Sequence, residues 1–286
     1  MAANAAALRG ITKQYKDFTL GPVDMTVPAG SIVGLIGENG AGKTTLLKIL
    51  CGVNRADDGT VDLLGGSPAD AATRAKIGVV FEDAFFYGSF TAAQVARSLA
   101  GMYGARWNAD SFSAYLRRFG LDAGKKLKEY SRGMRLKLSL AAALAHDPEL
   151  LVLDEATAGL DPVVRGELLD LFLEFIQDER HSIVMSSHIT ADLEQIADSI
   201  AYLHNGQLLF HENKDELLQS YGVLRCGESS LPSLPADLVI FTKRGAFGCE
   251  TLVKDRAAAR ELLPDAVCDA AGLDDIMRFY SGRDAQ

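Results

Sequence analysis

The chain has 286 residues, of which 29 are basic and 38 are acidic, so its formal net charge is −9. This acidic balance argues against a broad nucleic-acid-binding surface, because a phosphate backbone needs positive charge opposite it. The 48% of hydrophobic residues can form one large core, or one core and a small appendage.

The sequence contains no recognisable export or membrane-spanning segment. Residues 1–9 are rich in alanine and too short for the apolar core of a signal peptide. No apolar run approaches the roughly 20 residues that a helix needs to span a bilayer, so we expect a chain that is soluble by itself. Cysteines stand at positions 51, 226, 249 and 268, without a CxxC or metal-ligand spacing. We therefore expect reduced thiols, as in most cytosolic proteins.

Short apolar runs predict buried strands, and helical patterns lie between them. The runs are residues 31–36, 77–81, 150–153 and 182–186. Phe112, Leu116 and Phe119 share one face at helical spacing, and Leu168 and Phe172 share another. Strands that alternate with helices favour a parallel sheet covered on both faces.

The pattern changes after about Tyr221, and we expect a small C-terminal α/β domain over residues 222–286, after a main domain over residues 1–221. Ser and Pro indicate a turn, and two apolar runs around a glycine-containing stretch indicate a hairpin. The expected elements are a linker or turn at 229–235, a hairpin from 238–241 and 250–253, a helix at 257–263 and a last apolar stretch at 276–280.

Residues 37–44 read G-E-N-G-A-G-K-T and fit the phosphate-loop pattern G-x-x-x-x-G-K-[ST]. An apolar strand precedes them and a helical pattern follows. Backbone N–H groups of such a loop, with the positive end of the helix, hold phosphate oxygens. Lys43 would reach the β- and γ-phosphates, Thr44 would ligate Mg²⁺, and Thr45 is placed for the α-phosphate. The expected nucleotide-binding residues here are Gly37, Glu38, Asn39, Gly40, Ala41, Gly42, Lys43, Thr44 and Thr45.

A glycine-rich turn matches the four fixed positions by accident in roughly one chain in a hundred of this length. The loop therefore predicts a nucleotide site, but not the kind of enzyme.

The apolar run at 150–153 ends in two carboxylates, Asp154 and Glu155. Alone they are weak evidence, because a carboxylate after a strand is commonly just solvated. In doubly wound sheets, however, ligands sit at the carboxyl ends of the strands, where the phosphate loop also lies. Asp154 can then hold Mg²⁺ through water, and Glu155 can act as the general base on the attacking water.

The order of the motifs resembles that of ABC-type ATPases. After the phosphate loop come Y-S-R-G-M at 130–134, L-V-L-D-E at 151–155, T-A-G-L-D at 157–161 and then His188. The resemblance spans about residues 5–215, and residues 131–165 are most similar to bacterial ABC-2 exporter subunits of the YtrB and bacitracin-exporter type. It implies an α/β P-loop NTPase fold with a RecA-like core, an antiparallel β subdomain, a helical subdomain at about 85–145 and a small C-terminal α/β appendage.

The resemblance also implies roles for single residues. Tyr15 matches the aromatic residue that stacks on adenine, and Asp161 matches a loop that crosses a dimer interface. His188 matches the histidine that senses the γ-phosphate. The signature that caps the ATP of the opposite subunit would comprise Ser131, Arg132, Gly133 and Met134.

Each role has a plainer alternative. Tyr15 can be a core residue, and a lone His188 is more often structural. Ser131 can simply cap the following helix, and Asp161-Pro162 is a good helix start in its own right.

Two residues depart from the family's pattern. Arg132 replaces the first glycine of the common signature, which leaves its contact with the opposite subunit less defined. Glu82 stands where the resemblance expects a glutamine that reaches Mg²⁺. A carboxylate can bind Mg²⁺ but adds negative charge beside Asp154 and Glu155, so we expect Glu82→Gln to remain active with altered Mg²⁺ dependence.

An aromatic-rich stretch follows Glu82, with side chains at Phe85, Phe86, Tyr87 and Phe90. Packing in a core and a groove for a helix of a membrane partner are both open readings, since clustered exposed aromatics mark interfaces.

The sequence thus predicts an ATP-binding and ATP-hydrolysing subunit that uses ATP and Mg²⁺ and powers export through a separate membrane-spanning subunit. It would work as a homodimer or with a paralogous ATPase subunit, bind no nucleic acid, and lie in the cytoplasm at the inner face of the membrane through its partner. The alternative is a soluble ABC ATPase that acts on a macromolecular complex. A sensor that barely hydrolyses ATP is disfavoured, because the base Glu155 is present.

Overall fold

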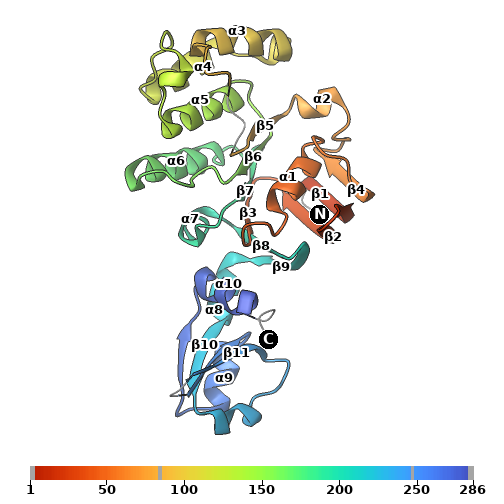
Figure 1. Cartoon of the computed structure of the whole chain (residues 1–286), viewed down its shortest axis with the longest axis vertical. Coiled ribbons are helices and arrows are strands. Elements are labelled where there is room, and N and C mark those ends of the chain that lie inside the picture. The colour runs from red at the N-terminus through yellow and green to blue at the C-terminus, as the bar shows by residue number, and fades with distance from the viewer. Residues whose placement is uncertain (1–3, 83–85, 246–247, 283–286) are drawn as a thin grey trace. The chain divides into compact units, whose positions relative to one another are not determined.

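The computed structural model describes residues 4–82, 86–245 and 248–282, which form two compact units (Figure 1). The first unit comprises the chain up to Ala197 together with Ala201–His211, and the second comprises Asp198–Ile200 and the chain from Glu212. The domain boundary near residue 221 stays a prediction. No helix in the described ranges combines the length and the apolar character needed to cross a membrane.

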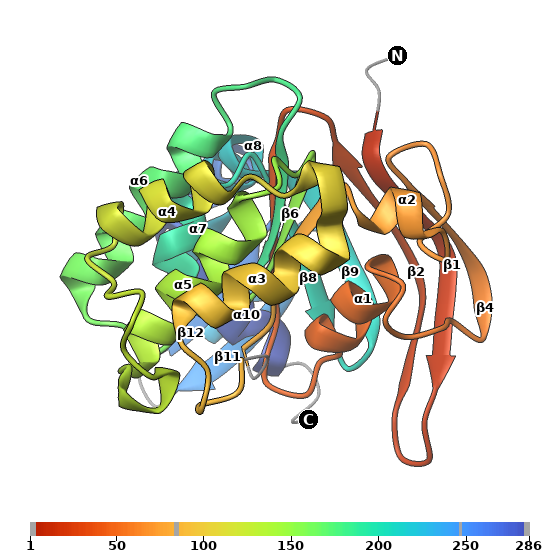
Figure 2. The same ribbon diagram turned by 90° about the horizontal axis from the view of Figure 1, so that it is seen from above.

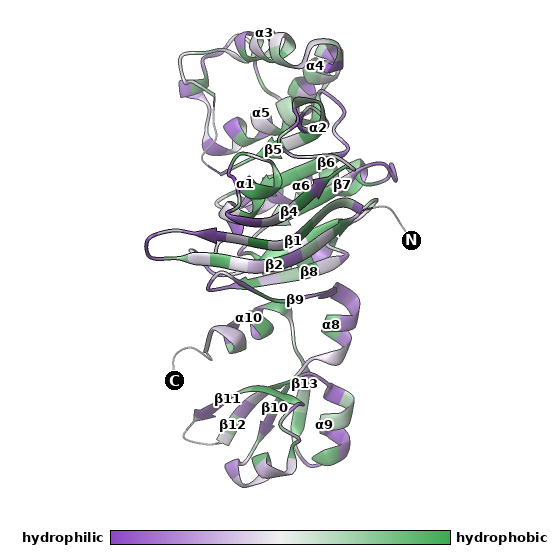
Figure 3. Cartoon of the chain, turned by 90° about the vertical axis from the view of Figure 1, so that its right-hand side faces the viewer, coloured by the Kyte–Doolittle hydropathy of each residue, from purple (hydrophilic) through white to green (hydrophobic). Residues whose placement is uncertain are grey.

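A six-stranded sheet forms the centre of the first unit. Its order is β5-β6-β7-β3-β8-β9, and β5, β6, β7 and β3 pair in parallel. The strands are β3 (Ile32–Ile36), β5 (Ile77–Val80), β6 (Leu150–Asp154), β7 (Ser182–Ser186), β8 (Ser199–His204) and β9 (Gln207–Asn213). Every residue of β3, β6 and β7 is buried, and the centres of β6 and β7 are hydrophobic (Figure 3). The four apolar runs are therefore confirmed as strands.

A second, antiparallel sheet of order β2-β1-β4 belongs to the same unit. It consists of β1 (Asn4–Gln14), β2 (Thr19–Pro28) and β4 (Asp58–Leu63). Helix α1 (Lys43–Leu50) lies beside both sheets (Figure 2). Leu46 and Leu50 of α1 share one apolar core with Met25 of β2, Leu35 of β3 and Val184 of β7, so α1 packs against strands of both sheets.

Three helices form a separate cluster in this unit: α3 (Ala92–Tyr103), α4 (Ala109–Arg118) and α5 (Arg132–Leu144) (Figure 1). Phe112 and Leu116 of α4 pack with Leu138 of α5 and Val95 of α3. Each helix begins at a capping side chain, because a hydroxyl or amide oxygen satisfies an N–H that has no partner within the helix. The caps are Thr91, Asn108 and Ser131.

The remaining helices of the first unit are α2 (Ala71–Arg74), α6 (Pro162–Phe175) and α7 (Thr190–Ile196). Helix α6 begins at the cap Asp161, whose Oδ1 accepts a hydrogen bond from Val164 N at 3.0 Å. Pro162 at its first position suits a helix start, since proline lacks the N–H that would be left unpaired there.

The described part of the second unit is an antiparallel sheet of order β11-β12-β10-β13 with three α-helices and one 3₁₀ helix. Its elements are α8 (Lys214–Ser220), β10 (Gly222–Cys226), β11 (Val239–Gly245), β12 (Gly248–Val253), α9 (Arg256–Leu262), β13 (Val267–Ala270) and α10 (Leu273–Ser281). The predicted hairpin is confirmed as β11 and β12. The linker expected at 229–235 was wrong in part, because residues 228–233 form a 3₁₀ helix. Leu231 and Leu234, three residues apart, pack against this unit's core.

Replacing Phe172 by alanine should destabilise the first unit by about 3–5 kcal/mol, because the side chain of Phe172 is completely buried and its removal leaves a cavity. Urea unfolding followed by the fluorescence of Trp107 measures the change. Val163→Ala on the same helix is the control, since Val163 is 72% exposed and should change stability by no more than about 0.5 kcal/mol. Equal effects of the two substitutions would contradict the packing described for α6.

Candidate functional site

The loop between β3 and α1 depends on glycine at its two ends. Gly37 has φ +156° and Gly42 has φ +107°, a region that other residues rarely adopt. A Cβ at Gly37 would lie 2.2 Å from the carbonyl oxygen of Leu203, and one at Gly42 would lie 2.9 Å from the ring of Phe18. Both positions therefore favour glycine, because the loop packs closely against Leu203 and Phe18.

Lys43, the first residue of α1, is held against this loop. Its side chain is almost completely buried, and Nζ donates to the carbonyl oxygen of Gly37 at 2.7 Å. Nζ also forms an ion pair with Glu155 Oε1 at 3.2 Å. A buried ammonium group needs such partners, since burial of an unpaired charge is costly. The amine therefore lies where the loop and the carboxyl end of β6 meet.

Asp154, the last residue of β6, is buried between two hydroxyl groups. Thr44 Oγ1 donates to Asp154 Oδ2 at 2.8 Å, and Ser186 Oγ donates to Asp154 Oδ1 at 2.7 Å. Ser186 Oγ also accepts from Glu155 N at 3.0 Å. Sequence reasoning missed Ser186, although its position at the end of a buried strand beside β6 was the available signal.

The side-chain oxygens of Thr44 and Asp154 are suited to bind a Mg²⁺ ion that also has ligands from outside the protein. The hydroxyl of Thr44 and the carboxylate of Asp154 are the hard oxygen donors that Mg²⁺ prefers. In the described ranges, no group of three or more His, Cys, Asp or Glu side chains could hold a metal ion. Mg²⁺ commonly binds through one or two protein oxygens and takes its other ligands from nucleotide phosphates and water.

Glu155 is fixed by contacts on both carboxylate oxygens. Its backbone has φ +51°, an uncommon conformation for a residue other than glycine and one that is often found at functional sites. Oε2 accepts from His188 N at 3.2 Å and lies 2.6 Å from His188 Nδ1, while Oε1 faces Lys43. The structure therefore brings the two predicted catalytic residues, Glu155 and His188, into direct contact.

A cavity of about 370 Å³ lies over the loop, and Lys43, Thr44 and Glu155 are among the residues that line it. Tyr15 and Phe18 lie at its aromatic side, with ring centroids 6.4 Å apart, and Tyr15 is 42% exposed. The core reading of Tyr15 is therefore wrong, whereas its contact with adenine stays a prediction. Phe18 was missed, although it lies three residues from Tyr15. The residues that line the cavity are Tyr15, Phe18, Glu38, Asn39, Gly40, Gly42, Lys43, Thr44, Thr45, Glu82 and Glu155.

The predicted signature and Asp161 do not line this cavity. Ser131 Oγ accepts from Met134 N at 3.2 Å at the start of α5, and Asp161 caps α6. Both helix-capping readings are confirmed. Arg132 is the first residue of α5, and its guanidinium lies 2.9 Å from Glu82 Oε1.

The aromatic stretch after Glu82 divides between core and surface. Phe86 and Phe90 are partly buried and pack against the helical cluster, whereas Tyr87 is 79% exposed. Phe85 lies outside the described residues. Core packing therefore accounts for Phe86 and Phe90, and Tyr87 is the aromatic residue of this group that a partner could contact.

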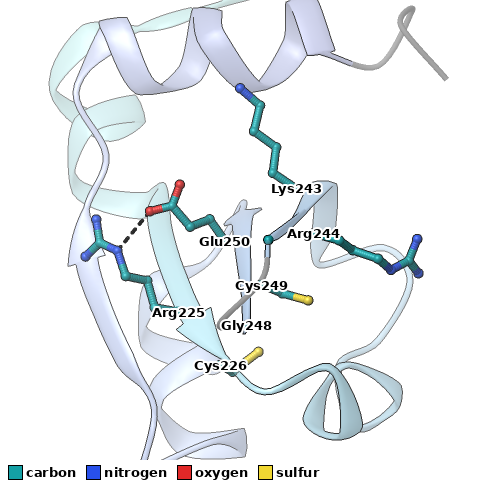
Figure 4. Close-up of a pocket in the computed structure, with 8 residues that line it drawn as sticks. Arg225, Cys226, Lys243, Arg244, Gly248, Cys249 and Glu250 are labelled. Carbon is teal, nitrogen blue, oxygen red and sulfur yellow. Dashed lines mark hydrogen bonds and ion pairs between the residues drawn. The ribbon is translucent and has the colours of Figure 1, made fainter.

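The second unit contains its own cavity of about 490 Å³ (Figure 4). Its two arginines have carboxylate partners, since Arg225 pairs with Glu250 and Arg244 with Glu228, and Lys243 Nζ lies 5.5 Å from the ring centroid of Phe279. Cys226 also lines the cavity, and burial raises the pKa of the Cys226 thiol, which disfavours the reactive thiolate. The arginines of this cavity are thus engaged by carboxylates, and Cys226 is not activated as a nucleophile.

The geometry of the first unit agrees with comparisons to known proteins. A family model described as ABC transporter matches residues 20–158. The chain is 36% identical to the bacitracin transport ATP-binding protein BcrA of Enterococcus faecalis, over 72% of this chain and 68% of that protein. It is 31% identical to the lantibiotic transport ATP-binding protein SrtF of Streptococcus pyogenes, over 83% of this chain and 98% of that protein.

A further relative is an uncharacterized ABC transporter ATP-binding protein of Synechocystis sp., 38% identical over 73% of this chain, and the match spans 60% of that relative's length. Among solved structures, an ATP-binding subunit of an ABC transporter superposes with a TM-score of 0.68 at 28% identity, over 74% of this chain and 91% of that chain. A dimeric bacterial ABC transporter cassette has the same fold, with a TM-score of 0.65 at 23% identity over 73% of this chain and 98% of that chain.

The fold is that of a P-loop NTPase of the ABC type, with the predicted core, antiparallel sheet, helical part and appendage. The chain belongs to the family of ABC transporter ATP-binding proteins. Proteins of this family bind nucleotide, dimerise and work with membrane-spanning partners.

Ser186→Ala should lower the free energy of unfolding by about 1–3 kcal/mol, because it leaves a buried carboxylate oxygen of Asp154 without its donor. Urea unfolding measures the loss. Ser139→Ala is the matched control, since the hydroxyl of Ser139 is buried and has no hydrogen-bond partner among the described residues. A loss no larger than that of the control would show that Ser186 does not hold Asp154.

Proposed function

We propose that this chain binds and hydrolyses ATP and thereby powers export through a separate membrane-spanning subunit. The observation that supports this most directly is the position of Glu155. Its carboxylate lies between Lys43 and His188 at the edge of the phosphate-loop cavity. A base is thus placed beside the groups that would hold the terminal phosphate.

The residues have separate tasks in this proposal. The loop N–H groups and Lys43 bind the phosphates, and Tyr15 stacks on the adenine. Thr44, Asp154 and Glu82 hold Mg²⁺, which neutralises charge on the phosphate oxygens. Glu155 orients the attacking water and takes its proton, and His188 holds the Glu155 carboxylate in place and senses the γ-phosphate. Such positioned groups account for most of the catalysis in phosphoryl transfer.

Two copies of the chain, or this chain and a paralogue, would form the complete site. Ser131, Gly133 and Asp161 lie outside the cavity of their own chain, which supports a role toward the ATP of a second subunit. Ser131 and Gly133 start α5, so the positive end of that helix is available to a phosphate. ATP would thus join two subunits, and hydrolysis would separate them.

Export is supported by the relatives that carry bacitracin transport and lantibiotic transport in their names. By this proposal the chain lies in the cytoplasm, attached to the inner face of the membrane through its partner. Because the partner would contact the transported molecule, the chain's own residues do not define the cargo.

Glu155→Gln should abolish phosphate release, because an amide cannot take the proton of the attacking water. Bound Mg·ATP then persists, so the variant should elute from a size-exclusion column as a dimer with Mg·ATP and as a monomer without it. Phosphate release by the parent, measured in parallel, provides the reference rate.

A Glu155→Gln variant that hydrolyses ATP at the parent's rate would exclude Glu155 as the base. A variant that binds ATP but stays monomeric would exclude the homodimer and leave a paralogue as the second subunit.

Tyr87→Ala combined with Met102→Ala should weaken assembly with the membrane-spanning subunit about tenfold and leave ATP binding by the isolated chain intact. Both side chains are largely exposed, at 79% and 78%, and exposed apolar side chains of this size often anchor an interface. Co-purification of the two subunits measures the assembly. Val267→Ala, at a residue that is 57% exposed in the second unit, is the control, and equal assembly of both proteins would remove Tyr87 and Met102 from the interface.

A further inference from the structure

We infer that Arg132 is a positioning residue for Glu82 and that the two side chains act as one unit at the edge of the nucleotide cavity. Arg132 holds the Glu82 carboxylate and compensates its charge, so that this carboxylate can line the cavity together with Glu155. The inference rests on the proposed ATP site.

The contact joins two segments that lie 50 residues apart in the sequence. Arg132 Nη2 donates to Glu82 Oε1 at 2.9 Å. Glu82 follows β5 and lines the cavity, whereas Arg132 belongs to the first turn of α5 and does not line it. The guanidinium therefore reaches from the signature to the edge of the cavity.

The guanidinium also lies against the turn that precedes α6. A Cβ on Gly159 would be 3.3 Å from Arg132 Nη1, and Gly159 has φ +70°. Arginine suits this place, because its planar fork can donate to a carboxylate on one edge while a flat face packs against backbone. Arg132 thus connects Glu82 with the turn that leads to Asp161.

The charges around the cavity indicate how the Arg132–Glu82 pair affects nucleotide binding. Lys43 already pairs with Glu155, and Asp154 takes hydrogen bonds from hydroxyl groups rather than from a cation. When no Mg²⁺ lies between them, an uncompensated Glu82 carboxylate at the cavity would repel the phosphates of a bound nucleotide. With Arg132 beside it, Glu82 adds little net charge.

The pair differs from the other exposed ion pairs of this unit. Arg118 and Glu174 form a pair of similar exposure, with Nη2 2.7 Å from Oε2, but neither lines the cavity. Exposed pairs alone contribute little to stability. The effect of Arg132 should therefore fall on nucleotide binding and not on folding.

The test is the affinity of the full chain for a fluorescent, non-hydrolysable ATP analogue, measured for the parent, Arg132→Ala, Glu82→Gln and the double variant. The affinities are measured once with Mg²⁺ and once with EDTA. The comparison separates the effect of the two side chains on the nucleotide phosphates from their effect on the metal ion. Arg132→Ala should weaken binding about fivefold in the parent background, the scale of one exposed charge interaction. In the Glu82→Gln background the same substitution should change binding less than about twofold.

Two further measurements separate charge from packing. Arg132→Lys should recover most of the affinity, because it keeps the positive charge, whereas Arg132→Gln should not. The fivefold effect should shrink at 1 M salt, where the screening length falls to about 3 Å. Arg118→Ala is the matched control and should leave the affinity unchanged, and Trp107 fluorescence verifies that each variant is folded.

An effect of Arg132→Ala that is equal in both backgrounds, or absent from both, would overturn the inference while leaving the ATP site in place. A folded parent chain that does not bind the analogue at all would overturn the proposed function, and this inference with it.

Discussion

The buried carboxylate of Asp154 is the group on which the arrangement of the site depends. A charged oxygen in the interior must be hydrogen-bonded, and its two donors come from different parts of the chain, Thr44 on α1 and Ser186 on β7. These bonds join the start of α1 to the carboxyl ends of β6 and β7. Because Glu155 is the next residue, its place beside Lys43 follows from the same bonds.

A series of two contacts extends this arrangement to the surface. The first joins Lys43, after the loop, to Glu155 at the end of β6, and the second joins Glu155 to His188 after β7. The left-handed backbone of Glu155 is the conformational cost of aiming its side chain back over the loop. The parallel sheet keeps these ends together, because its strands are buried on both faces and paired in register.

Local patterns were enough to predict the phosphate loop, the four buried strands, the helix starts at Ser131 and Asp161, and the hairpin of the second unit. The strands β1, β2 and β4 were not predicted individually from their residues. In β2, Val23, Met25 and Val27 are buried and the polar residues between them are exposed, which is the alternation of a strand, so a signal for this strand was present in the sequence. Ser186 could be seen at the end of a predicted strand, but its bond to Asp154 and the contact between Glu82 and Arg132 each require knowing which distant segments meet. Leu231 and Leu234 lie in a segment rich in Ser and Pro, a composition that indicates a linker or turn. Their packing against the core of the second unit depends on the tertiary structure and could not be predicted from that composition.

The hydroxyl of Ser131, which caps α5, can accept one hydrogen bond and donate another at the same time. Ser131 Oγ uses a lone pair to accept the hydrogen bond from Met134 N, and a serine hydroxyl also carries one proton that it can donate. Capping therefore fixes the position of the oxygen and leaves the direction of its proton to whatever acceptor approaches. A phosphate oxygen that arrives at this helix start would meet a donor that is already in place, together with the unpaired N–H groups of the first turn.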